Sequence, residues 1–137
     1  MRLATMFWRL RLLTLGVLLF QAAVPAFAHH SVTGIFDVTK TIEVTGKISK
    51  LEWINPHSYL YVEAQEGGQT VTYSFETLPP AMMRRAGVNR EALLGGSPDV
   101  GQTVTVQANP AKADAHSGWI TLITYPDGHS YQLASRQ

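Results

Sequence analysis

The sequence contains no cysteine among its 137 residues. Disulfide bonds, thiol nucleophiles and cysteine-ligated metal centres are therefore excluded, and packing alone must stabilise the fold. The motifs of several enzyme classes are absent as well, since the sequence has no nucleophile elbow, no zinc-protease helix motif and no phosphate-binding loop. These absences favour a protein that is not an enzyme.

Acidic residues are absent from residues 1–28, which contain three arginines followed by an uncharged, largely apolar run over residues 12–24. The segment ends at Ala28 with the small-residue spacing that signal peptidase requires. The run of 13 residues is shorter than the ~20 that a helix needs to cross a bilayer. We therefore expect a cleavable signal peptide over residues 1–28 and a periplasmic or secreted protein, with an uncleaved membrane anchor as the alternative.

No second long apolar run follows residue 28, so we expect no membrane insertion after cleavage. Basic residues are also few in the mature chain. Loss of the three arginines lowers the formal charge from +1 to −2, and Arg84 and Arg85 are its only adjacent basic residues. A domain that binds nucleic acid normally gathers a basic excess on one face. We therefore expect no nucleic-acid partner.

Alternating apolar residues are the clearest structural signal in the mature chain. They occupy every second position at Ile42, Val44 and Ile48, and the phase then slips to Leu51. A slip by an odd number of residues indicates a bulge or a strong bend within one strand, and a glycine marks where it can occur. We place this bend near Gly46.

The same alternation predicts five further strands, one hairpin and a helical connector. The second and third strands occupy residues 59–64 and 70–76 around a turn at 66–69, the connector occupies 79–94, and the remaining strands occupy 104–108, 119–125 and 131–133. Three meandering strands, a helical connector and two more strands are the chain order of the OB-fold. We therefore predict a mainly β fold, a small five- to six-stranded OB-like barrel over residues 41–137 with a short helical connector between strands three and four. An extended segment over residues 29–40 precedes it, and a small sandwich is the alternative architecture.

Several short motifs resemble an uncharacterised family of small exported bacterial proteins, the domain of unknown function 6152. The resemblance rests on His29-His30-Ser31, Phe36-Asp37, Gly46, Glu52-Trp53, Asn55-Pro56-His57, Glu76, and Gly101 before Val104-Thr105-Val106. The tryptophan followed by Asn-Pro-His is the most specific part. The chain departs from the family pattern at Val88, where a tryptophan is usual, and in a longer connector over residues 95–100. The resemblance implies export but no established activity.

Histidine placement suggests a metal site. Cleavage after Ala28 makes His29 the first residue of the mature protein, where its amine and ring can chelate one metal, and such nitrogens suit Cu(II) best among common divalent ions. His57 and His116 fall in the two loops that flank the binding face of an OB-fold, although His116 also fits a solvated loop. His29, His57 and His116 are therefore candidate copper ligands, in an arrangement that resembles a histidine-brace site.

Ordinary structural roles compete with these hypotheses. His29 and His30 are equally well explained as frayed terminal residues. Asn55 has the residue type and the neighbouring proline of a simple turn. Trp53 and Trp119 each follow the alternation of a strand, so core packing is the expected role of both.

We therefore predict a non-catalytic exported binding module, for a small ligand or another exported protein, which requires no cofactor. Its expected ligand-binding residues lie in the loops and on the outer sheet face: His30, Trp53, Asn55, Tyr59, Tyr61 and Glu76. The first alternative is a periplasmic Cu(II)-binding protein that uses His29 with the loop histidines. The second is a hydrolase, with Glu52 and Glu76 as its acid–base pair. The sequence predicts no oligomeric state.

Overall fold

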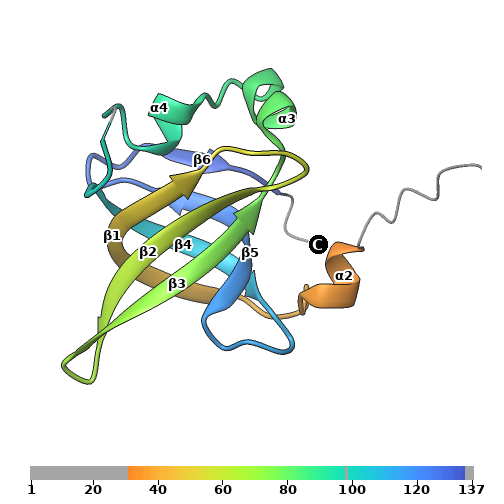
Figure 1. Ribbon diagram of the computed structural model, residues 1–137, viewed down its shortest axis with the longest axis vertical. Coiled ribbons are helices and arrows are strands. Elements are labelled where there is room, and N and C mark those ends of the chain that lie inside the picture. Colours follow the sequence, from red (N-terminus) through yellow and green to blue (C-terminus); the bar gives the residue numbers. More distant parts are fainter. Residues whose placement is uncertain (1–30, 98, 135–137) are drawn as a thin grey trace, which may run out of the picture.

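The computed structural model describes residues 31–97 and 99–134 (Figure 1). The expected signal peptide and the candidate ligands His29 and His30 lie outside the described residues. The chain order is α2 (Val32–Ile35), β1 (Ile42–Glu52), β2 (Ser58–Glu66), β3 (Gln69–Thr77), α3 (Pro80–Arg85), α4 (Arg90–Leu93), β4 (Thr103–Pro110), β5 (Ser117–Thr124) and β6 (Ser130–Gln132). Within residues 31–97 and 99–134, no helix is both long and apolar enough to cross a lipid bilayer.

The strands form a closed barrel. Their order is β3, β2, β1, β4, β5 and β6, and a parallel pairing of β3 with β5 joins the ends of the first five. β6 then pairs with the part of β5 that lies beyond β3. A closed five-stranded barrel with one extra strand and a helical connector after the third strand confirms the predicted OB-like, mainly β fold.

Apolar side chains of alternate strand positions fill the interior of the barrel. Fully buried examples from five strands are Ile48, Leu60, Val62, Phe75, Val106 and Ile123. On β3 the predicted phase is confirmed, because Tyr73 and Phe75 are buried while Thr72 is exposed. In Figure 1 the connector helices α3 and α4 lie over one end of the barrel, and they contribute Met83 and Leu93 to its core.

The bend in β1 is present, but it does not lie at Gly46. The register of β1 against β2 shifts between Ile48 and Lys50, which places the bulge at Ser49. Gly46 has a different role, because a Cβ at this position would lie 2.3 Å from the carbonyl oxygen of Glu63. The glycine therefore permits the close approach of the neighbouring strands β1 and β2.

A second bulge, in β5, reverses the expected orientation of Trp119. Gln107 of β4 faces Leu122, whereas Ala108 faces Ile120, so one residue of β5 is left without a partner on β4. Side chains that would share a face in a regular strand therefore point to opposite faces when they lie on different sides of this bulge. Trp119 is buried, but it lies apart from the barrel core that contains Ile123.

Candidate functional site

Three side chains meet on the outer surface of the barrel. Glu76 of β3 is paired with Tyr59 of β2 on one side and with Trp119 of β5 on the other. Residues directly opposite one another on neighbouring strands project from the same face of a sheet. Tyr59, Glu76 and Trp119 therefore form one row across three strands, close to the loop between β1 and β2 and the loop between β4 and β5.

The N-terminal segment of residues 31–40 covers one end of this row. Phe36 is 4% exposed and packs on Trp119, with ring centroids 6.0 Å apart and a tilt of 50° between the rings. Its backbone forms an antiparallel bridge with Ala111, just beyond β4. The segment that was expected to be extended thus contains the short helix α2 and is docked on the barrel beside the hairpin that joins β4 and β5 (Figure 1).

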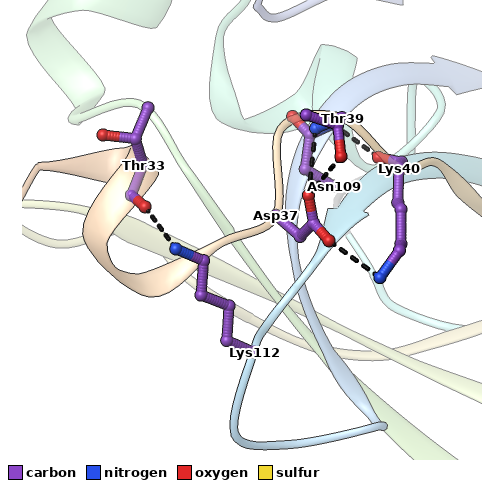
Figure 2. Close-up of polar contacts among 6 residues, drawn as sticks. All are labelled: Thr33, Asp37, Thr39, Lys40, Asn109 and Lys112. Atoms are coloured by element: carbon purple, nitrogen blue, oxygen red, sulfur yellow. Dashed lines mark hydrogen bonds and ion pairs between the residues drawn. The ribbon is translucent and has the colours of Figure 1, made fainter.

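Main-chain hydrogen bonds fix this segment to the hairpin. The amide of Asp37 donates to the carbonyl of Pro110 at 2.9 Å, and the amide of Lys112 donates to the carbonyl of Ile35 at 3.0 Å. Figure 2 shows that the Lys112 side chain also reaches α2, where Nζ donates to the carbonyl of Thr33 at 2.8 Å. Main-chain and side-chain hydrogen bonds therefore connect residues 33–37 with residues 110–112.

A second set of contacts closes the turn that leads into β1 (Figure 2). The Thr39 hydroxyl donates to Oδ1 of Asp37 at 2.6 Å, and Nζ of Lys40 lies 2.9 Å from Oδ2. Asn109 donates from Nδ2 to the carbonyl of Lys40 at 2.8 Å. Hydrogen bonds from Thr39 and then Lys40 lower the pKa of Asp37 to about 2. The Asp-x-Thr pattern, a common side-chain-capped turn, is a signal in the sequence that indicates this turn.

A pocket of about 450 Å³ lies between α2, β3 and the loop that joins β4 and β5. Its apolar lining comes from Ile35, Phe36, Ala111, Ala113 and Gly118. Its polar lining comes from Tyr59, Ser74, Glu76, Lys112, Asp114 and Ser117. The docked N-terminal segment therefore supplies one wall, and the outer face of the barrel supplies the floor.

Tyr59 and Glu76 of this floor lie next to His57, which is hydrogen-bonded to Glu76. Nδ1 of His57 bonds Oε1 of Glu76, and their side chains are 28% and 14% exposed. The His57 ring also meets the Trp119 ring edge to face, with centroids 5.5 Å apart. Burial, and then the nearby charge of Glu76, raise the pKa of Tyr59, which lies opposite Glu76 on the neighbouring strand. Glu76 thus acts as the centre of this group.

The opposite wall carries a second carboxylate, that of Asp114. Its Oδ2 accepts a hydrogen bond from the Ser117 hydroxyl at 2.5 Å, and its Oδ1 accepts one from the His116 amide at 2.9 Å. The hydrogen bond from Ser117, and then the one from the His116 amide, lower the pKa of Asp114. The loop therefore holds an ionised carboxylate at the rim of the pocket.

The remaining candidate residues lie elsewhere. The Tyr61 hydroxyl donates to Oε2 of Glu52 at 3.2 Å, one row away from Tyr59 on the same face of β2. Trp53 is half-buried against the core, and Asn55 is exposed in the loop between β1 and β2. The structure thus brings together His57, Tyr59 and Glu76 among the predicted site residues.

The candidate copper ligands His57 and His116 make different contacts. His116 packs edge to face on Tyr73 at 5.2 Å, and its carbonyl accepts a hydrogen bond from the amide of Ser74. His57 instead contacts Glu76 and Trp119. Among residues 31–97 and 99–134 no group of three or more His, Asp or Glu side chains lies together as a metal site. His29 falls outside that range, so the copper hypothesis stays a prediction.

Comparison with solved structures identifies a similar protein, the mitochondrial single-stranded DNA-binding protein Rim1 from S. cerevisiae. It is 16% identical, the match covers 69% of this chain and 96% of that chain, and the TM-score is 0.45. This match corrects the expectation that nucleic acid is excluded as a partner, because the similar protein binds single-stranded DNA.

Among curated proteins, none matches this chain. A family model does match, over residues 17–120, which include β1 to β4, the helical connector and the start of β5. The chain belongs to this family, the Family of unknown function (DUF6152).

Proposed function

We propose that this chain is an exported, non-catalytic binding module that takes a small ligand into the pocket between α2, β3 and the β4–β5 loop. The observation that carries the proposal is the pocket itself, with a volume of about 450 Å³, apolar walls and a floor where Tyr59, Ser74 and Glu76 meet. Small-molecule sites typically have volumes of about 300 to 1,000 Å³ and combine an apolar lining with a few polar groups.

The shape of the pocket favours a small molecule over another exported protein. A stable protein partner typically covers about 800 Å² on each side, on a surface that is mostly flat. Here the docked segment of residues 31–40 and the β4–β5 loop rise on two sides of the floor, so a bound molecule would be enclosed. Enclosure gives a small ligand most of its apolar burial.

The side chains around Glu76 support binding rather than catalysis. The Ser117 hydroxyl donates to Asp114, and the Ser58 hydroxyl donates to the carbonyl of Ile54 at 3.4 Å, so neither is activated by His57. Glu52, the other half of the acid–base pair considered for a hydrolase, is engaged by Lys50 at 2.5 Å and by Tyr61. The hydrolase alternative therefore gains no support from this geometry.

Nuclear magnetic resonance titration tests the small-ligand proposal. Mature ¹⁵N-labelled protein is titrated with indole, p-cresol and cyclohexanol, and we expect at least one to shift the amides of Ser74, Glu76 and Ala113. Ser74→Phe should fill the pocket and abolish the shifts, whereas the matched change Thr72→Phe, on an exposed position of the same strand, should preserve them. Absence of any pocket shift would overturn the proposal, as would an oligothymidylate that occupies the same residues at lower concentration.

Export is part of the proposal, and it is supported by the charge and apolar pattern of residues 1–28. The intact mass of protein recovered from the host periplasm or medium is the test. A mass that corresponds to residues 29–137 is expected. A chain that keeps its first 28 residues would contradict cleavage.

A second candidate function, Cu(II) binding, is favoured by one contact. A histidine that ligates a metal usually bonds a carboxylate through its other ring nitrogen, which fixes the ring and its tautomer. His57 has this arrangement, because its Nδ1 bonds Glu76 and its Nε2 is the nitrogen left for a metal. Its test depends on the free amine of His29 in the mature protein.

A further inference from the structure

Two carboxylates enter the pocket from different walls. Glu76 projects from β3 at the floor, and Asp114 projects from the loop between β4 and β5. A carboxylate has about four lone-pair positions for donors; the bond from His57 uses one of those of Glu76, and the bonds from Ser117 and His116 use two of those of Asp114. Both carboxylates can therefore accept another hydrogen bond from a bound molecule.

The described residues that line the pocket include more negative than positive side chains. Glu76 and Asp114 face one lysine, Lys112, whose Nζ is directed to the carbonyl of Thr33 at 2.8 Å on the α2 side. His57 bonds Glu76 from outside the lining. The lining therefore has an excess of one negative charge.

Aromatic rings complete the lining. Phe36 and Tyr59 belong to the pocket wall and floor, while Ile35, Ala111 and Ala113 supply aliphatic surface. The face of an aromatic ring attracts an organic cation, and a desolvated site strengthens this attraction. Rings together with carboxylates are the groups that recognise alkylated ammonium ions in proteins.

An inorganic cation fits this pocket less well. Calcium takes about six to eight oxygen ligands, and magnesium keeps several waters, so both require a polar cage. Among residues 31–97 and 99–134 no group of three His, Asp or Glu side chains lies together. Apolar walls instead match the alkyl groups of an organic cation.

We propose that the ligand of this pocket is a small organic ammonium ion with an apolar body, its charge held between Glu76 and Asp114 and its alkyl groups against Tyr59 and the aliphatic wall that contains Ile35. This inference rests on the proposed binding function, since it names the chemical class of the ligand that occupies the same pocket.

Three probes of one shape and different charge test the inference. Choline, 3,3-dimethylbutan-1-ol and 3,3-dimethylbutanoate are titrated into mature ¹⁵N-labelled protein, and the amides of Ser74, Glu76 and Ala113 are followed. Choline should bind about tenfold more tightly than the neutral alcohol, in line with the usual strength of a cation–π contact in a desolvated site. The carboxylate should bind most weakly.

Variants identify the carboxylates responsible. Glu76→Gln and Asp114→Asn should each weaken choline binding about tenfold while leaving the alcohol unaffected, because each variant removes one ionic attraction to the quaternary ammonium, which has no N–H to donate. Glu63→Gln is the matched control, since Glu63 lies exposed on β2 and outside this pocket. Thermal unfolding shows whether each variant is folded. If one of the two variants does not fold, the other still tests the contribution of a carboxylate to choline binding.

The outcomes separate this inference from the function on which it rests. Equal affinity for all three probes, or a preference for the carboxylate, would overturn the ammonium assignment and leave the pocket as a small-ligand site. Binding of indole or p-cresol, together with no binding of choline, would also overturn the ammonium assignment and leave the pocket as a small-ligand site. If neither the charged nor the neutral probes shift the pocket amides, the proposed function fails as well.

Discussion

Phe36 and Trp119 pack against each other on the outside of the barrel, and this contact attaches the N-terminal segment to the pocket. Both rings are almost fully buried, yet neither belongs to the barrel core. The energy of this contact therefore stabilises the docked segment more than the barrel. It also positions Ile35 and Phe36 as the wall of the pocket.

Phe36→Ala should therefore release the segment locally without unfolding the barrel. Hydrogen exchange is the measurement, because the amides of Asp37 and Lys112 bond across the docked interface. Their protection should fall sharply while that of β1 and β4 remains. Ile35→Ala, at a 40% exposed position in the same segment, is the control and should have a small effect. Equal loss of protection throughout would mean that segment and barrel unfold as one unit.

Phe75→Ala should destabilise the whole barrel. Phe75 is fully buried, and truncation of a core aromatic typically costs about 3 to 5 kcal/mol. Thr72→Ala, at an exposed position of the same strand, should stay within about 0.5 kcal/mol. Denaturant unfolding monitored by circular dichroism gives both free energies. Similar losses for the two variants would contradict the strand phase.

The fold was predictable because alternation in the strands is unambiguous where the strands are regular. β3 is such a strand, and the expected burial of Tyr73 and Phe75 is confirmed. Alternation fails at a bulge, since one unpaired residue reverses the phase of everything beyond it. Trp119 and Ile123 would share a face in a regular strand, but the bulge in β5 separates them. Nothing local in the sequence marks that bulge.

The candidate site was predictable in its parts but not in its arrangement. His57, Tyr59 and Glu76 were each expected in a loop or on an outer face, whereas their hydrogen bonds depend on the register between β2 and β3. The docking of Phe36 was not predicted either. Tertiary contacts hold α2 and residues 36–40 to the barrel, and a short segment without alternation carries no signal for its partner.

Gly46→Ala should be costly because the new Cβ would lie 2.3 Å from the carbonyl oxygen of Glu63. β1 and β2 would have to separate, and overpacking of this kind typically costs about 1 to 3 kcal/mol. Gly34→Ala is the matched control, since its nearest neighbour, Cβ of Ser31, is 3.9 Å away and alanine favours a helix. Thermal unfolding compares the two. A neutral effect at Gly46 would show that the strands are less closely packed than described.

Asp37 should make the docked segment sensitive to acid. Its pKa is lowered to about 2 by Thr39 and Lys40, so the carboxylate stabilises the folded turn above its ordinary pKa of 3.8 and this contribution is lost as the pH falls toward 2. The Thr39 amide, which donates to Oδ1 of Asp37, should titrate with a midpoint near pH 2 in nuclear magnetic resonance spectra. Asp37→Asn should remove that transition. A midpoint near 4 would mean that the bonds to Asp37 are not formed.

Copper binding should depend on the free amine of His29. The amine and ring of a terminal histidine chelate together, and Nε2 of His57, oriented by Glu76, would provide a third nitrogen. One added alanine ahead of His29 preserves every side chain but converts the amine into an amide, so the Cu(II) affinity should fall sharply. His57→Ala should also weaken binding, and Glu76→Gln should weaken it less, through the orientation of the ring. His116→Ala is the matched control, because His116 packs on Tyr73 instead.

The measurement is competition with a chelator, using mature protein whose mass confirms that it begins at His29. Unchanged affinity after extension would end the histidine-brace hypothesis, because the free amine of His29 would then contribute nothing to binding. If extension weakens binding and His57→Ala does not, the metal is held by the terminus without the barrel, and the pocket beside Glu76 is left for the small ligand.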